Sequence, residues 1–126
     1  MRRLKQFARA SDGGTAAEFA LVLPIMILLT FGGMGASWMM YANTSVHYAT
    51  EDAARCFAVN TTVCTNAAAV QTYGVGKYRG PTLASLTFTA STQACGRQVV
   101  GTGTYTLRTG LRTISVPISA TSCYPA

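Results

Sequence analysis

The chain has 126 residues, of which 49% are hydrophobic and 11% are charged, and its formal net charge is +6 at pH 7. This length allows one small domain. Half of the positive excess lies in the first 13 residues, and the other basic residues are scattered along the chain. A nucleic-acid-binding protein clusters its basic residues on one surface, so we expect no nucleic-acid partner.

A basic leader, residues 1–13, precedes an apolar segment, residues 14–42. The leader contains Arg2, Arg3, Lys5 and Arg9, whereas the apolar segment contains one charged side chain, Glu18. Residues 19–40 are long enough to cross a bilayer, because about 20 helical residues span about 30 Å. Trp38 and Tyr41 follow where interfacial aromatic anchors are expected. The leader is expected to stay cytoplasmic, which places the C-terminal part outside.

Two other interpretations of this segment are a removable signal peptide and a plain signal anchor. A removable signal peptide is disfavoured, because the apolar run exceeds a typical h-region and no clear A-x-A cleavage site follows it. A plain signal anchor, with Glu18 in the headgroup layer, would need no assembly.

Glu18 is a carboxylate at the edge of the predicted membrane-spanning helix. A charge buried unpaired in lipid costs about 3 kcal/mol. If the chain is cut after Gly13, the new amine lies on Gly14 and Glu18 becomes the fifth residue. We expect the ammonium group of one subunit to neutralise Glu18 of the next. A cut after Gly14 would make Glu18 the fourth residue, so we favour Gly13.

This arrangement of basic leader, glycine, carboxylate and apolar helix resembles the type IV pilin class. The segment GGTAAEFALVLPIMILLTFG resembles more specifically the TadE-like pseudopilins of the tight-adherence (Flp) pilus system. The residues that carry the resemblance are Thr15, Ala16, Ala17, Glu18, Phe19, Leu23 and Pro24. The similarity is dense over residues 13–35 and continues weakly through residues 49–56.

The resemblance implies a minor pilin or pseudopilin, not an enzyme, that supports pilus biogenesis and adherence. It implies cleavage at Gly13 and Gly14 by a prepilin peptidase, and assembly through Glu18, Phe19 and Pro24. The implied partners are other pilins or pseudopilins, an assembly platform, its ATPase complex and the bacterial inner membrane, with the C-terminal domain in the periplasm. The alternative is a signal-anchored periplasmic scaffold or binding domain that does not assemble.

We expect residues 43–126 to form an extracytoplasmic α+β domain of the pilin type. The first helix is predicted from about Ala16 to about Val59, because an apolar stripe recurs at spacings of three and four. This stripe consists of Val46, Ala49, Ala53, Cys56 and Phe57, with Thr50 and the charged residues outside it. A short helix over residues 66–78 is expected to turn Ala68, Val70, Tyr73 and Val75 inward.

Residues 82–120 alternate between apolar and polar side chains. This period of two predicts three antiparallel strands, over residues 84–90, 99–108 and 113–120, whose apolar face packs on the first helix. Thr109 and Gly110 are expected to form a hairpin turn. Pro117 lacks a backbone donor and favours an edge position for the last strand.

Cys56, Cys64, Cys95 and Cys123 all lie in the outer domain and permit three disulfide pairings. Pairing Cys56 with Cys64 would close a short loop, and pairing Cys95 with Cys123 would join the start of one strand to the end of the last. Each disulfide would contribute about 2–4 kcal/mol. A zinc site is disfavoured because there is no C-x-x-C motif and the compartment is oxidising.

The sequence offers few candidate catalytic residues. His47 and Glu51 have helical i, i+4 spacing, but a third metal ligand is not evident, and a solvated helix face is the simpler interpretation. The sequence contains no phosphate-binding loop and no nucleophile elbow. We therefore expect no enzymatic activity, no metal and no cofactor.

Overall fold

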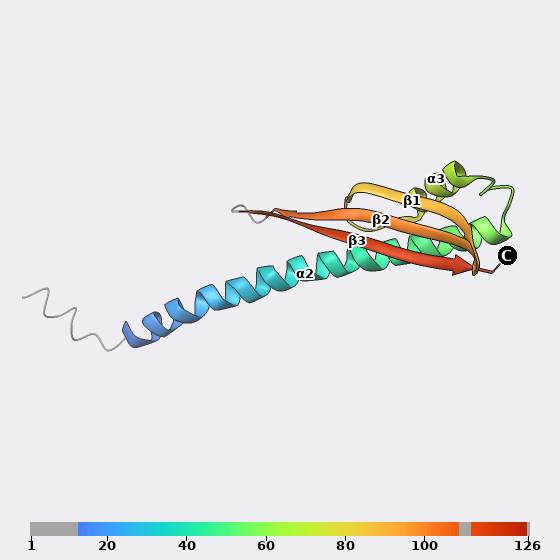
Figure 1. Ribbon diagram of the computed structural model, residues 1–126. Coiled ribbons are helices and arrows are strands. Elements are labelled where there is room, and N and C mark those ends of the chain that lie inside the picture. Colours follow the sequence, from blue (N-terminus) through green and yellow to red (C-terminus); the bar gives the residue numbers. More distant parts are fainter. Residues whose placement is uncertain (1–12, 109–111, 126) are drawn as a thin grey trace, which may run out of the picture. The chain divides into compact units, whose positions relative to one another are not determined.

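The computed structural model describes residues 13–108 and 112–125. Within them the elements follow the order α2 (Gly13–Val59), α3 (Ala67–Lys77), β1 (Ala84–Gln93), β2 (Gly96–Arg108) and β3 (Thr113–Tyr124) (Figure 1). This arrangement confirms the predicted α+β class, with a long first helix, a short second helix and a three-stranded antiparallel sheet. The chain forms two compact units, Met1–Ala36 and Ser37–Ala126.

Helix α2 begins at Gly13, three residues before the predicted start, and ends at Val59 as predicted. Ala16 and Ala17 have the highest helix propensity, and the helix extends from them by one further turn toward the N-terminus. The backbone N–H of Asn60 donates to the carbonyl oxygen of Cys56 at 2.8 Å, and this bond closes the last turn.

Helix α3 has a defined cap at each end. The Asn66 side chain accepts a hydrogen bond from the Ala69 N–H at 2.9 Å, and the Tyr78 N–H donates to the Gly74 carbonyl at the other end.

The predicted inner face of α3 was wrong in part. Val70 and Gly74 are buried, whereas Ala68 is exposed and Val75 is 44% exposed. Residues four apart share a helix face, so once Val70 is buried, position 74 follows it. The prediction chose Val75 for its apolar side chain, but the structure places a glycine at the contact.

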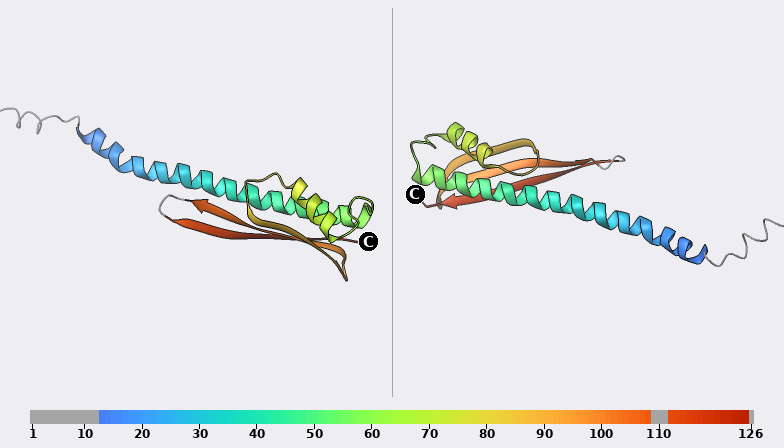
Figure 2. Two further views of the ribbon diagram at one scale, coloured as in Figure 1. Left: turned by 90° about the horizontal axis from the view of Figure 1, so that it is seen from above. Right: turned by 180° about the vertical axis from the view of Figure 1, so that it is seen from behind.

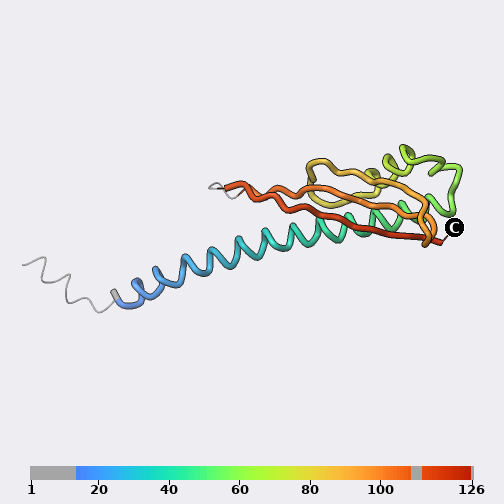
Figure 3. Tube along the Cα trace, viewed as in Figure 1, coloured from blue at the N-terminus to red at the C-terminus, as the bar shows by residue number. Residues whose placement is uncertain are grey.

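The three strands form one antiparallel sheet in the order β1-β2-β3, so β3 with Pro117 lies at an edge as predicted (Figure 3). The first hairpin pairs Gln93 with Gly96, and Gly96 has a φ of 122°, a conformation that favours glycine. The second hairpin pairs Arg108 with Thr113. The predicted turn at Thr109 and Gly110 lies outside the described residues.

The apolar face of the sheet packs on the C-terminal part of α2, as Figure 2 shows. The fully buried helix residues Ala42, Val46, Ala49 and Ala53 are small or branched, which allows the sheet to approach closely. Thr50 corrects the prediction because it is also fully buried, where its hydroxyl donates to the Val46 carbonyl at 2.7 Å. A hydroxyl satisfied in this way can enter a core.

The segment that joins α3 to β1 is tied to α2 by hydrogen bonds. The Arg79 N–H donates to Ser45 Oγ at 2.9 Å, and the Tyr41 hydroxyl donates to the Arg79 carbonyl at 2.7 Å. Tyr78 donates to the Pro81 carbonyl at 2.6 Å. These bonds fix where α3 ends and where β1 begins.

Candidate functional site

The N-terminal part of α2 exposes its apolar side chains on all sides. Residues 14–34 are all exposed, among them Phe19 at 64%. The helix contains a window with a mean hydropathy of 2.1, enough by length and composition to cross a membrane. A helix that is apolar all round needs lipid or other helices around it, because water solvates it poorly.

Glu18 lies among these apolar residues, one turn and a half from the start of α2. The sequence contains no other Asp, Glu, Lys or Arg between Gly13 and Thr50. Glu18 is exposed, and within residues 13–108 and 112–125 it makes no ion pair or side-chain hydrogen bond. Its carboxylate is therefore accessible to a cation from outside this part of the chain.

The glycines of the predicted processing site occupy the first turn of α2. Gly13 is the first helical residue and Gly14 the second, whereas the helix was predicted to begin at about Ala16. The first four N–H groups of a helix have no acceptor within it, so this turn is the part of α2 that unwinds most easily.

Pro24 lies inside α2, and the helix continues through it. Proline has no N–H, so the carbonyl oxygen four residues earlier loses its helical donor. Further along, a stripe of small residues comprises Gly32, Gly33, Gly35, Ala36 and Ser37. A β-carbon built at Gly32 would meet no atom within 4 Å, so the helix surface is open to close approach there.

Residues 13–55 match a family model described as TadE-like protein. This part of the chain is TadE-like. No curated protein and no solved structure matches the chain. The TadE-like match indicates a pilin-like protein associated with a tight-adherence pilus, and this family is structural and non-enzymatic. Helix α2 is long and apolar enough to fit a single-pass membrane anchor.

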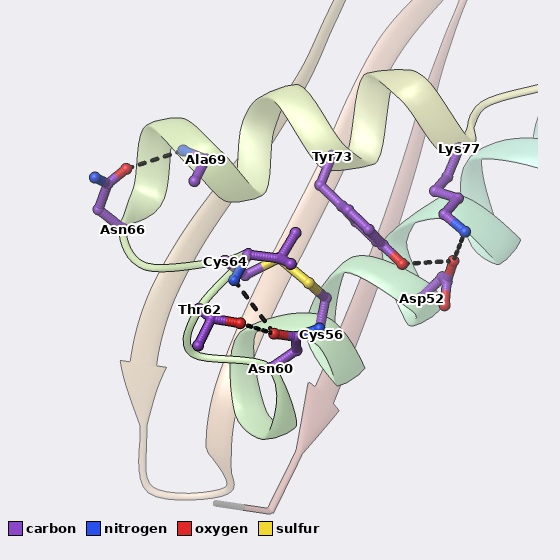
Figure 4. Close-up of a disulfide and its surroundings, with 10 residues drawn as sticks. Asp52, Cys56, Asn60, Thr62, Cys64, Asn66, Ala69, Tyr73 and Lys77 are labelled. Carbon is purple, nitrogen blue, oxygen red and sulfur yellow. Dashed lines mark hydrogen bonds and ion pairs between the residues drawn. A yellow bond between two sulfur atoms is a disulfide. The ribbon is translucent and has the colours of Figure 1, made fainter.

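The TadE-like segment ends at a disulfide-bonded turn. Cys56, in the last turn of α2, is bonded to Cys64, and their Cα atoms are 5.9 Å apart (Figure 4). Asn60 organises the loop between them, because its side-chain oxygen accepts hydrogen bonds from the Thr62 hydroxyl and the Val63 N–H. The disulfide therefore holds the end of α2 close to the start of α3.

A second disulfide joins Cys95 to Cys123, with Cα atoms 6.2 Å apart. Cys95 lies in the turn between β1 and β2, and Cys123 lies near the end of β3. Both cross-links are in the compact unit Ser37–Ala126, and all four cysteines of the sequence are used.

The structure also places together charged residues that the sequence analysis did not connect. Lys77 Nζ lies 3.2 Å from Asp52 Oδ2, and the Tyr73 hydroxyl donates to the same oxygen at 3.4 Å (Figure 4). The hydrogen bond to Asp52, followed by the contact with Tyr73, raises the pKa of Lys77 above 10.5. These contacts join α3 to α2. They could not be predicted from the sequence, because Asp52 and Lys77 are 25 positions apart.

Among the described residues, no arrangement of side chains suggests catalysis. His47 and Glu51 are exposed one turn apart on α2, and among the described residues no three His, Cys, Asp or Glu side chains are placed to hold a metal ion. Depressions of about 200 and 190 Å³ open to solvent beside Asp52 and Arg55. They are lined by the ion-paired Asp52 and by arginine, and neither offers an activated nucleophile.

Proposed function

We propose that this protein is a minor pilin or pseudopilin of a tight-adherence pilus, and that it is assembled through the N-terminal half of α2. A prepilin peptidase removes residues 1–13, and Gly14 then carries the N-terminal ammonium group. The protein supports pilus biogenesis and adherence as an initiator or tip component, because its outer domain is far larger than a bulk fibre subunit needs.

The observation that carries this proposal is the exposed Glu18 on an apolar, TadE-like helix. A carboxylate in lipid is destabilised unless a cation compensates it. After a cut at Gly13, the nearest new cation in an assembly of identical helices is the terminal ammonium group of a neighbouring subunit. The exposed apolar surface around Phe19 and the break in hydrogen bonding at Pro24 then lie at the contact between helices.

The topology follows from the leader. Its four basic residues favour the cytoplasmic face of the inner membrane, so the unit Ser37–Ala126 lies in the periplasm. Both disulfides lie in that unit, which suits an oxidising compartment. The assembly platform and its ATPase complex then act on the part of α2 that lies in the membrane.

Intact-mass measurement of protein purified from its native membrane tests the proposal. The expected mass lacks residues 1–13 and corresponds to two disulfides. A mass that lacks residues 1–14 would move the cut by one glycine and make Glu18 the fourth residue. A mass that retains Met1 would favour the alternative, a signal-anchored scaffold or binding domain that does not assemble.

A further inference from the structure

The hairpin formed by β2 and β3 is longer than the rest of the sheet. Strand β1 begins at Ala84, which pairs with Thr104, so residues 105–108 of β2 have β3 as their partner and extend past β1 (Figure 2). We call residues 107–108 and 112–114 the hairpin end. Arg108 pairs with Thr113, and Leu107 pairs with Ile114.

Two contacts inside the compact unit show the direction in which this hairpin runs. At one end, the Arg97 guanidinium lies 4.6 Å from the ring centroid of Phe57, and Arg97 pairs with Tyr124. At the other, Ile118 packs in one cluster with Ala42 and Val46. Strand β3 therefore runs parallel to this part of α2, and its start points toward Ser37.

Strand and helix rises then give the reach of the hairpin. From Ile118 back to Thr113 is five residues, about 17 Å at about 3.4 Å each. From the level of Ala42 and Val46 back to Ser37, α2 rises by about 7–14 Å. The hairpin end thus lies at the Ser37 end of the unit.

The chemistry of this end of the unit suits a membrane surface. Arg108 and Arg112 are exposed, Ile114 is 46% exposed, and the sequence has no Asp or Glu after Asp52. Trp38 and Tyr41 lie at the same end, half exposed, with ring centroids 6.2 Å apart. Arginines that bind phosphate, beside aliphatic and aromatic side chains, are typical of a protein surface that lies in the headgroup layer.

We propose that the hairpin end binds the anionic phospholipid headgroups of the membrane in which α2 is anchored. It is a second contact with lipid, beside the helix, and it limits how far the periplasmic unit tilts away from the bilayer. The proposal rests on the membrane anchor in the proposed function and is independent of cleavage and of Glu18.

The test uses the full chain reconstituted into vesicles of phosphatidylcholine alone or mixed with phosphatidylglycerol. A fluorophore is attached at Thr113→Cys or, as the matched control, at Thr121→Cys, and is quenched by lipids that carry a spin label on the headgroup. Both threonines are exposed on β3, but Thr121 lies eight residues farther from the hairpin end. Intact mass verifies that both native disulfides persist.

We expect strong quenching at position 113, weak quenching at position 121, and a clear increase with phosphatidylglycerol. Each arginine contributes about fivefold to such binding, so the double variant Arg108→Glu/Arg112→Glu should lose most of the quenching. Arg55→Glu, the same charge change at an exposed position on α2 near its C-terminal end, should leave it unchanged.

Equal quenching at positions 113 and 121, or no difference between the two lipid compositions, would overturn the proposal. The comparison of lipids requires no arginine variant, so it holds even if a charge reversal perturbs the fold. Glu18→Gln should keep the quenching whether or not it assembles. A failure of the pilin proposal is thereby distinguished from a failure of this one.

Discussion

The ring of Phe88 lies directly against Gly74, where α3 crosses β1. A β-carbon at position 74 would be 2.6 Å from Cγ of Phe88, far inside van der Waals contact. Phe88 is 2% exposed and belongs to the main core, so its ring has little room to move. The glycine that weakens α3 as a helix is therefore the residue that lets α3 pack on the sheet.

We predict that Gly74→Ala destabilises the protein and that Gly76→Ala, in the same helix, does not. A β-carbon at position 76 meets nothing within 4 Å, so that variant gains up to about 1 kcal/mol of helix propensity. At position 74 the alanine brings the same gain in helix propensity, but its clash with Phe88 costs about 1–3 kcal/mol. Denaturant unfolding of the full chain in detergent micelles measures the difference, and equal stabilities would show that Phe88 relaxes freely.

Gly74 also illustrates what sequence reasoning missed. The periodic stripe on α2 was predictable, since Val46, Ala49 and Ala53 repeat with the helical period and are all fully buried. Thr50 was placed outside the stripe by its polarity, but its hydroxyl is satisfied by its own helix and so can be buried. The burial of Gly74 and of Thr50 depends on the element packed against each residue and not on the residue's own hydropathy.

In the candidate site, too, some features were predictable from the sequence and others depend on packing between elements. Glu18 and the glycines before it are recognisable locally, because their spacing in the chain carries the signal. The ion pair of Asp52 with Lys77 depends on how α3 lies on α2, and the reach of the hairpin depends on which part of α2 strand β3 packs against. Neither the ion pair nor the hairpin reach has a local pattern, so the sequence could not predict them.

The two disulfides should contribute unequally to stability. The chain entropy that a cross-link removes from the unfolded state grows with the length of the loop it closes. The paired cysteines are 8 positions apart in Cys56–Cys64 and 28 positions apart in Cys95–Cys123. Replacing both cysteines by alanine should cost about 2.5 kcal/mol for the first pair and about 3.5 kcal/mol for the second. Chemical denaturation of the two double variants checks the order, and a larger loss for the shorter loop would contradict the entropic account.

Alkaline pH should destabilise the protein through Tyr78. Burial, with smaller contributions from Tyr41 and Tyr105, raises the pKa of Tyr78 above its ordinary value of 10.0. Because the folded-state pKa exceeds the unfolded one, this contribution is complete below pH 10.0 and is lost as pH rises through the folded pKa. The raised pKa of Lys77 has the same sign, with its loss beginning above pH 10.5.

The variant Tyr78→Phe isolates the contribution of Tyr78 to the loss of stability at alkaline pH. It removes the hydrogen bond to the Pro81 carbonyl, which should cost about 1 kcal/mol at neutral pH, and it should flatten the decline above about pH 10. Tyr48→Phe, at a position that is 63% exposed, is the control and should keep the wild-type slope. Unfolding midpoints measured from neutral pH to about pH 11 compare the three proteins; identical slopes would show that Tyr78 does not govern the decline.

Glu18→Gln should separate membrane insertion from assembly. The amide has nearly the shape of the carboxylate but no charge, so insertion and cleavage should continue while the attraction to a neighbouring ammonium group is lost. Incorporation beside partner subunits should fall sharply, as measured by cross-linking in membranes and by counting surface pili. Glu51→Gln changes an exposed carboxylate on the outer part of the same helix and should assemble normally. Normal piliation by the Glu18 variant would mean that the carboxylate enters lipid without a partner and that assembly depends on the apolar surface alone.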